Sequence, residues 1–461
     1  MNRRRSIRPD VALSLPLWLS LSLWLPHCAA APATVARPLT GLPIAGLLKD
    51  GVFDAGPVAL QLPPGAVVPA DGAALAALLA DPKGPTDIWL GARSYRGDFV
   101  VRRTVALHGS GPESLLQGTG RGTVLDVTAN GALLENFALT GTGGHHTSED
   151  AAVKLRGERN TLSRLAMTNV LFGASLQACH DCRVQRLHVQ GQTGTTSQRG
   201  DGIKLWESHG SVIENCLVED VRDMVVWYSR KVTVQGCVVR RSRYGCHFMY
   251  AHDSAMRRSA LLDNTVGVFV MYSARLSVRD SVLAGARGPA GIGLGCKDSD
   301  DITIAGNWLV GNTVGNYLDS TPNAAGKFVR LNGNVLAVND IALRLHGRPH
   351  GVAVHDNDWR DNAEVVQVDS GGDATSADVV GNYWSDYVGF DLNDDGVGDV
   401  AFELKQLSSE WTDQHPALKL LHGTLALATV DAVARAVPVL SSKRLISDAR
   451  PAMAPHKLTH E

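Results

Sequence analysis

The sequence has little of what marks several large classes of protein. Aromatic residues make up only 6% of its 461 residues, and the formal net charge at pH 7 is −2. A nearly neutral chain has no overall basic field that would attract nucleic acid. Extensive disorder is excluded as well, because 44% of the residues are hydrophobic. These figures leave a large globular protein, and its 47 glycines favour one with many turns.

Long apolar runs are also missing beyond the N-terminus, so no later segment is expected to span a bilayer. The N-terminus combines an arginine cluster with a short apolar run, Val11 to Leu25, and then the small residues Cys28 to Ala30. These are the three parts of a secretory signal peptide, so we expect residues 1–30 to direct export. An uncleaved membrane anchor and a lipid-modified Cys28 are the alternatives, and the export pathway stays open.

A repeat of about 22 residues runs through the middle of the chain. Tyr228, Tyr250 and Tyr272 recur at this interval, as do Gly245 and Gly267. Each repeat holds short alternating runs rich in β-branched residues and bounded by Asn, Asp, Gly or Ser, which indicates strands and turns instead of helices. The fixed pattern of leucine-rich repeats is absent. We therefore predict an all-β fold, a right-handed parallel β-helix (a solenoid) of about 22 residues per coil.

The extent of the repeat divides the chain into segments. These are the signal peptide at 1–30, an N-terminal cap region at 31–85, the β-helix at 86–387, an Asp-rich loop at 388–403 and a C-terminal helical tail at 404–461. Within the cap region, Ala73 to Leu79 is expected to form a short helix over the open first coil. The apolar part of the tail, Ala417 to Val439, would either cover the last coil or dock onto a partner.

The Asp-rich loop is a candidate calcium site. Asp391, Asn393, Asp395 and Asp399 place side-chain oxygens at alternating positions around a turn-making glycine, as in the first half of a calcium-binding loop. Phe402 occupies the place where such a loop needs a bidentate glutamate. A plain turn rich in Asp and Asn is therefore the alternative.

Stacking of the coils turns residues one repeat apart into columns. One column is apolar at every coil and is expected to point into the core: Val226, Phe248, Val270, Cys296 and Leu318. Neighbouring residues of a strand point to opposite faces. The next column should therefore point outward: Trp227, Met249, Met271, Lys297 and Asp319. His247 lies two residues before Met249 and shares this outward, solvent-facing direction.

The outer face therefore offers a candidate metal site. His247, Met249 and Met271 would supply one imidazole and two thioethers, a donor set that suits Cu(I) better than Zn(II) or Ca(II). Exposed methionines in one patch also need a reason, whereas buried ones would not. The alternative is that a loop, for instance Gly285 to Gly291, covers this face and makes it a small secondary core. A register error of one residue would turn the same side chains inward.

The cysteines allow several interpretations. Cys179 and Cys182 form a C-x-x-C motif without a second pair, which is a weak signal for zinc and is equally compatible with redox chemistry or a disulfide. Cys216 and Cys237 occupy equivalent positions in successive coils and are expected to pack in an internal ladder, with a disulfide between the coils as the alternative. Strand alternation points Cys246 toward the core.

Several motifs resemble those of a known family. They are WYS, RYGCHFMY, VGVFVMYS, KDSDD and GNYLDS within the coils, and NYWSDYVGFDLNDDGVGD after them. These motifs resemble the NosD family of maturation proteins of nitrous oxide reductase, and the resemblance covers most of the chain, from the first coils to the C-terminal helix. Cys246 and Ala251 depart from the Ser-like residues expected inside the family motif, which leaves direct metal ligation by Cys246 open.

The resemblance implies a periplasmic protein that is associated with the inner membrane through the membrane subunit of an ABC transporter. It also implies a role in building the copper–sulfide centre of nitrous oxide reductase, with copper accepted from a chaperone and material passed on to the reductase. What the residues themselves add is a candidate place for the copper, His247 with Met249 and Met271.

The alternative function is that of an enzyme, because many parallel β-helices are lyases, hydrolases or epimerases of polysaccharides. The coils offer carboxylates, among them Asp223 and Asp253, but these fall mostly at corners, where turn chemistry favours Asp. No closely spaced acid/base pair stands out, and methionines stand where basic or aromatic sugar-binding residues would be expected. We therefore expect a protein that is not an enzyme. An adaptor without any ligand is a third hypothesis.

Overall fold

The computed structural model describes most of the chain from residue 54 onward. The described residues are 54–347, 349–369, 373–405, 411, 415–421, 424, 426–427, 429–430, 433 and 444–456. The predicted signal peptide at 1–30 and most of the predicted helix at 417–439 lie outside them.

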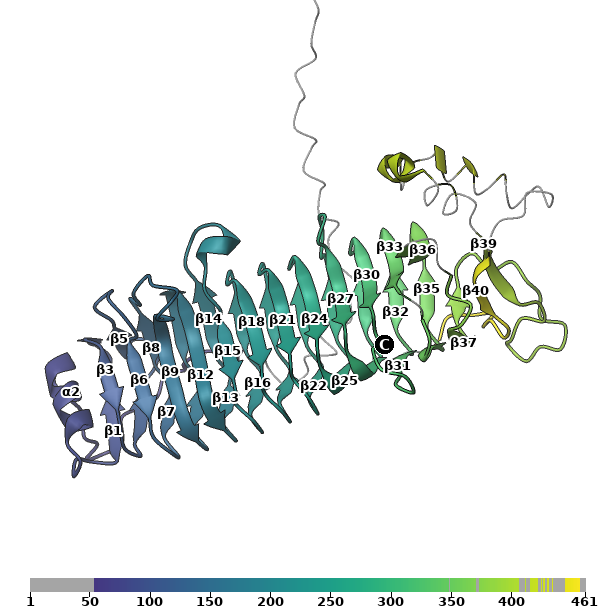
Figure 1. Cartoon of the computed structure of the whole chain (residues 1–461). Helices are drawn as coiled ribbons and strands as arrows, with labels where there is room; N and C mark the ends of the chain where they lie inside the picture. The colour runs from purple at the N-terminus through teal and green to yellow at the C-terminus, as the bar shows by residue number, and fades with distance from the viewer. Residues whose placement is uncertain are drawn as a thin grey trace, which may run out of the picture. The chain divides into compact units, whose positions relative to one another are not determined.

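Three parallel sheets surround one apolar core, and each coil of the chain contributes a strand to each sheet in turn. Successive strands of a sheet lie side by side in the order of the chain (Figure 1). The solenoid has about 13 turns with about 23 residues per turn. The predicted all-β parallel β-helix is therefore confirmed.

The first sheet consists of β1 (Asp87–Leu90), β4 (Ala106–Gly109), β7 (Leu133–Glu135), β10 (Thr161–Ser163), β13 (Arg183–Gln185), β16 (Val212–Glu214), β19 (Thr233–Gln235), β22 (Ala255–Arg257), β25 (Ala274–Arg279), β28 (Asp300–Ala305), β31 (Val329–Asn332), β34 (Val352–His355) and β37 (Asp378–Val380). The second sheet consists of β2 (Ser94–Arg96), β5 (Leu115–Gln117), β8 (Ala138–Thr140), β11 (Ala166–Val170), β14 (His188–Gly191), β17 (Leu217–Glu219), β20 (Val238–Arg240), β23 (Ala260–Leu262), β26 (Val282–Ala284), β29 (Trp308–Val310), β32 (Val335–Ala337), β35 (Asp358–Arg360) and β38 (Tyr383–Trp384).

The third sheet consists of β3 (Phe99–Val101), β6 (Leu125–Thr128), β9 (Ala151–Glu158), β12 (Phe172–His180), β15 (Ile203–Trp206), β18 (Asp223–Trp227), β21 (Tyr244–Met249), β24 (Val266–Met271), β27 (Ile292–Lys297), β30 (Val314–Asp319), β33 (Ile341–His346) and β36 (Glu364–Val368). The other described elements are α2 (Gly72–Ala80), the short 3-10 helices η2 (Thr196–Gln198) and η4 (Pro416–Leu421), and the strands β39 (Phe402–Lys405) and β40 (Arg444–Asp448).

The helix α2 contacts β2 and β3 of the first coil. Asp71 caps its N-terminus by accepting a hydrogen bond from the Ala74 amide at 2.8 Å. Leu75 and Leu79 are buried, so the helix shields apolar surface that an open first coil would expose. The helix predicted at residues 73–79 is confirmed. No helix in the described part of the chain is long and apolar enough to cross a membrane.

The register of the third sheet confirms the columns predicted from the repeat. The column that is buried in the core at every coil is Val226, Phe248, Val270, Cys296 and Leu318. The column on the opposite face of the same strands is Trp227, Met249, Met271, Lys297 and Asp319. Alternation along each strand therefore determines which side chains lie in the core and which lie on the outer face, as the sequence predicted.

A ladder of buried side chains runs along one corner of the core. Its members are Cys216, Cys237, Ser259, Ser281, Asn307, Asn334, Asn357, Asn382 and Asp448. In its second half, the side-chain oxygen of each asparagine accepts from both the main-chain and the side-chain amide of the previous one, at 2.9 and 3.0 Å between Asn307 and Asn334. Cys216 and Cys237 begin the ladder as buried free thiols, which confirms their predicted packing role.

The ladder ends on β40, which pairs antiparallel with β39 and contacts the last coil. Asp448 Oδ2 accepts from the main-chain and side-chain amides of Asn382 at 2.8 and 2.9 Å, and from Trp384 Nε1 at 3.3 Å. This strand lies inside segment 404–461, for which the sequence predicted helix, and corrects that prediction over its residues. It is extended because it pairs with β39, and this pairing leaves Ile446 buried and Asp448 at the end of the ladder.

Candidate functional site

The structure brings together the three residues that the sequence assigned to a copper site. Met249 in β21 pairs with Met271 in β24, so the two side chains are neighbours on the outer face of the third sheet. His247 lies on the same face, with its Nε2 3.3 Å from Met271 Sδ. One imidazole and two thioethers thus come from two adjacent strands.

His247 is buried, although its side chain points away from the core of the solenoid. It is only 6% exposed. The Tyr244 ring stacks on it with the ring centroids 4.8 Å apart, and Trp227 meets it edge-on at 5.6 Å. The prediction of a solvent-facing His247 was therefore wrong, because aromatic side chains of its own face cover the imidazole. The alternative left open by the sequence was cover by a loop, whereas the cover observed on His247 consists of the side chains of Tyr244 and Trp227.

The two methionines form the accessible side of the site, since both are partly exposed. In the next coil of the same column, Lys297 pairs with Met271 strand to strand. Lys297 Nζ donates a hydrogen bond to Asp319 Oδ2 at 2.6 Å. The carboxylate of Asp319 therefore compensates a positive charge that would otherwise repel a metal ion at Met271.

The tautomer of His247 follows from its partners. Trp227 Nε1 lies 3.3 Å from His247 Nδ1, and an indole N–H can only donate. Nδ1 must therefore carry the lone pair, which leaves the proton of the neutral ring on Nε2, directed at Met271 Sδ. Burial is the main cause that lowers the pKa of His247 to about 4, so the ring is neutral at pH 7.

This donor set fits a soft monovalent ion. Thioethers and neutral imidazole are suitable ligands for Cu(I). Nε2 can bind a metal ion only after its proton moves to Nδ1, which then no longer accepts from Trp227. Metal binding and the position of Trp227 are therefore linked. Cys246 takes no part, because it is fully buried in the core, where burial raises the pKa of its thiol well above the usual value.

A second group of titratable residues lies in the strands and turns just before this face. Asp201 is 1% exposed and accepts from Arg222 through Oδ1 at 2.9 Å, whereas its Oδ2 has no hydrogen-bond partner among the residues that the structure describes. Burial, opposed by Arg222 and assisted by the negative charge of Asp223, raises the pKa of Asp201 to about 6. Asp223 is itself buried and paired with Arg243. The sequence offered Asp223 but not Asp201, which is hidden among turn-type residues.

The four candidate calcium ligands lie in one loop, whose own backbone uses their oxygens. Asp391 accepts from the amides of Asp395 and the following glycine at 3.3 and 2.8 Å. Asn393 Oδ1 accepts from the Asp395 amide at 3.2 Å, and Asp399 accepts from a main-chain amide at 2.7 Å. Within the described ranges, no three His, Cys, Asp or Glu side chains form a group that could hold a metal ion. These bonds are those of a turn rich in Asp and Asn, and calcium binding stays a prediction.

Cys179 and Cys182 form a disulfide whose sulfurs are buried. Of the alternatives that the sequence left open for the C-x-x-C motif, the structure shows the disulfide. His180 stands between the two cysteines and points to the outer surface, where it belongs to the groove described next.

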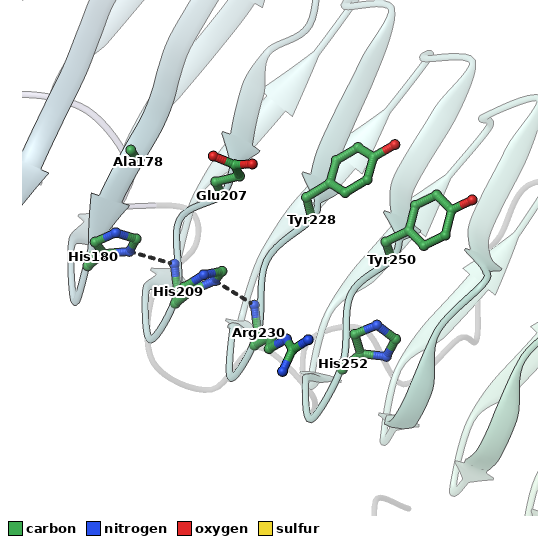
Figure 2. Close-up of a pocket in the computed structure, with 8 residues that line it drawn as sticks. All are labelled: Ala178, His180, Glu207, His209, Tyr228, Arg230, Tyr250 and His252. Atoms are coloured by element: carbon green, nitrogen blue, oxygen red, sulfur yellow. Dashed lines mark hydrogen bonds between the residues drawn. The ribbon is translucent and has the colours of Figure 1, made fainter.

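A groove with a volume of about 700 Å³ lies along the corner that follows the third sheet. Figure 2 shows that two rows of side chains line it, each made of equivalent positions in successive coils. One row, the tyrosine row, consists of Ala178, Glu207, Tyr228 and Tyr250. The other, the histidine row, consists of His180, His209, Arg230 and His252. The 22-residue repeat revealed the tyrosine row. It did not reveal the row of His180 and His209, because the polar insertion at 192–199 breaks the spacing between them.

Residues 185–389 match the family model described as "Periplasmic copper-binding protein (NosD)". A "Probable ABC transporter binding protein NosD" from Stutzerimonas stutzeri is 26% identical over 421 residues, which cover 81% of this chain and 88% of the relative. A protein of the same description from Pseudomonas aeruginosa is 29% identical over 414 residues, covering 79% of this chain and 87% of the relative.

Solved structures with the same fold include two carbohydrate-active enzymes. The A-module of the mannuronan C-5 epimerase AlgE6 from Azotobacter vinelandii superposes with a TM-score of 0.52 at 14% identity, covering 72% of this chain and 98% of that one. The catalytic domain of a GH87 α-1,3-glucanase gives 0.53 at 11% identity, covering 71% of each chain. Identities this low show the shared fold and nothing about activity.

The family match lies over the coils that carry the methionines and most of the groove, and the two relatives extend the likeness over about 80% of the chain. This chain is thus similar to the NosD family over most of its length.

Proposed function

We propose that this protein is a periplasmic copper carrier that holds Cu(I) at His247, Met249 and Met271 and supplies it for assembly of the copper–sulfide centre of nitrous oxide reductase. Copper is its cargo in this proposal, and the protein binds and transfers the ion without acting as an enzyme. The description of the matching family as periplasmic and copper-binding supports both the metal and the location.

One observation carries the proposal: His247 Nε2 lies 3.3 Å from Met271 Sδ, with Met249 directly beside Met271 on the adjacent strand. Three soft or borderline donors at one point on an outer sheet face are more than packing requires. Because thioethers hold Cu(I) without a charged ligand, a carrier built this way can release its ion to stronger ligands.

The partners follow from the same proposal. The relatives' description as ABC transporter binding proteins supports the membrane subunit of such a transporter as a partner at the inner membrane. A copper chaperone would then deliver the ion, and nitrous oxide reductase would receive it.

The test is competition for Cu(I) against a chromophoric chelator. Met249→Ala combined with Met271→Ala should weaken binding on the order of tenfold for each lost thioether, where tenfold corresponds to about 1.4 kcal/mol. Met453→Ala is the matched control, because Met453 is a partly exposed methionine outside the coils. Unchanged affinity in a double variant that still unfolds cooperatively would show that copper binds elsewhere.

A polysaccharide-modifying enzyme is the second candidate, favoured by one observation. Asp201 is a buried carboxyl group with a raised pKa beside a second buried carboxylate, Asp223, and such pairs are typical of general acids. This function predicts shortening or epimerisation of oligosaccharides that Asp201→Asn abolishes. The copper carrier predicts no turnover and unchanged Cu(I) affinity in the same variant.

A further inference from the structure

We propose that the groove between the tyrosine row and the histidine row is the docking surface for the protein that exchanges copper with this one, and that this partner contacts the groove through carboxylate side chains. The inference rests on the proposed copper-carrier function. The groove is the one shown in Figure 2.

The groove and the methionines are adjoining parts of one surface. Tyr250 directly follows Met249 in the chain, and Tyr272 directly follows Met271. Tyr228, Tyr250 and Tyr272 stack on one another with ring centroids 5.0 and 5.1 Å apart, and they separate the methionines from the groove. A specific interface buries roughly 800 Å² on each partner. A protein close enough to take an ion from the two sulfurs therefore also covers the groove.

The tyrosines occupy backbone positions that favour other residues. Their φ angles are +50° at Tyr228, +51° at Tyr250 and +50° at Tyr272, in the left-handed region. A bulky residue there costs roughly 1–2 kcal/mol, of which stacking recovers a part. The following coils place Asp298 and Ser320 in this conformation. Tyr228 and Tyr250 are each 39% exposed, so core packing does not account for them, whereas rigid, exposed tyrosines are typical of protein interfaces.

The histidine row presents hydrogen-bond donors to the groove. His180 Nδ1 accepts from the His209 amide at 3.3 Å and His209 Nδ1 from the Arg230 amide at 3.2 Å, the two bonds drawn in Figure 2. His252 Nδ1 accepts from the Ala274 amide at 3.1 Å. A neutral imidazole whose Nδ1 accepts carries its proton on Nε2. Burial lowers the pKa of His209 and of His252, which keeps both rings neutral donors.

The charges of the groove favour an acidic partner. Arg230 is exposed, and its side chain makes no hydrogen bond or ion pair within the described residues, whereas Arg275 is held by Asp253. The edges of stacked aromatic rings also carry the positive end of their quadrupole. Glu207 is the single acidic residue in the lining. Imidazole N–H groups, a free guanidinium and ring edges together are complementary to carboxylates on a partner surface.

Two other occupants fit the groove less well. A metal ion at Nε2 of His180, His209 or His252 would cost each ring its hydrogen bond from a main-chain N–H group, and the lining offers no thioether beside them. A sugar would need open ring faces, but the faces of Tyr228 and Tyr250 lie against each other, with the rings 15° from parallel.

The experiment compares two donors of Cu(I) in stopped-flow transfer to the full chain. One donor is a purified periplasmic copper chaperone loaded with Cu(I), and the other is a small Cu(I) chelate that needs no docking surface. We expect Arg230→Glu to slow transfer from the chaperone by tenfold or more and to weaken its salt dependence, because electrostatic steering governs association. Transfer from the chelate should stay unchanged. Arg258→Glu is the matched control, since it makes the same charge change at an exposed position on another corner.

The outcomes separate the docking proposal from the proposed function. Chaperone transfer that is equal in the two variants would overturn the docking surface, and so would equal slowing of both donors by Arg230→Glu. Tight binding of acidic oligosaccharides that Arg230→Glu abolishes would assign the groove to sugars instead. Failure of the unmodified protein to take Cu(I) from the chelate would contradict the copper-carrier function itself.

Discussion

Trp227 donates its indole N–H to Nδ1 of His247 across the adjacent strands β18 and β21, at 3.3 Å. The bond places the proton of His247 on the nitrogen that faces Met271. The same nitrogen is the only one available to a metal ion, so the bond holds His247 in the form that does not bind.

We therefore expect Trp227→Phe, which keeps the ring but removes the donor, to tighten Cu(I) binding. Breaking one hydrogen bond costs about 0.5–1.5 kcal/mol, so the gain should be roughly two- to tenfold. Chelator competition measures the affinity, and nitrogen-15 NMR of the copper-free protein reports the tautomer. Trp206→Phe is the control, because Trp206 is the paired residue one coil before Trp227 and is therefore two coils from His247. Weaker binding in Trp227→Phe, or a proton already on Nδ1 in the unmodified protein, would refute this coupling.

Asp201→Asn should stabilise the protein at neutral pH. Because the folded state raises the pKa of Asp201 from 3.8 to about 6, Asp201 contributes stability below pH ~4 and loses that contribution as the pH rises through about 6. Near pH 4 the variant and the unmodified protein should have the same free energy of unfolding. Above pH 6 that of the variant should be higher by up to about 3 kcal/mol, reduced by the stability that is lost when Arg222 no longer faces a carboxylate. Denaturant unfolding across this pH range measures the gap, and Asp340→Asn, the same substitution at an exposed carboxylate, is the control. A constant gap at all pH values would contradict the assignment.

Asn316→Leu should also stabilise the fold. Asn316 is fully buried between Leu294 and Leu343 in an inward column, and in the described part of the chain neither its side-chain nitrogen nor its oxygen has a hydrogen-bond partner. Removing an unsatisfied buried amide is worth about 1–3 kcal/mol. Asn312→Leu is the contrasting control. Asn312 accepts from the Ala286 amide at 2.9 Å, so the same change there should destabilise the protein. We expect the midpoint of thermal unfolding to rise in Asn316→Leu and to fall in Asn312→Leu. A less stable Asn316→Leu would show that the amide is hydrogen-bonded in solution.

Asp448→Ala should loosen the last coil. The substitution leaves the Asn382 amides and the Trp384 indole without their acceptor, at a cost of about 2–4 kcal/mol. Because coils of a solenoid contact only their neighbours, the loss should be local. Hydrogen exchange should rise at Asn382 and stay unchanged at Asn307. An equal rise in hydrogen exchange at Asn382 and Asn307 would argue against a local role of Asp448 at this end of the solenoid.

The repeat was enough to predict the solenoid and the direction of most side chains. A 22-residue period and strand alternation placed Phe248 in the core and Met249 beside Met271. The burial of His247 could not be predicted, because its cover combines Tyr244 of its own strand with Trp227 of the previous coil.

Features that join irregular parts of the chain were also beyond the sequence. The polar insertion at 192–199 hides the register between His180 and His209. The strand β40 pairs with β39 across a long intervening segment, and local propensity alone favours helix there.

The asparagine ladder has a direction, and its last member determines where the solenoid ends. Each asparagine receives a bond from one side and passes one to the next, so an asparagine corner can always be followed by another coil. Asp448 differs from asparagine by one atom, an oxygen in place of a nitrogen, and an ionised carboxylate can only receive. Asp448 therefore ends the ladder, because it has no side-chain amide to donate to a further member. A solenoid lengthened by an inserted asparagine coil before Asn382 would keep Asp448 as the last member of the ladder.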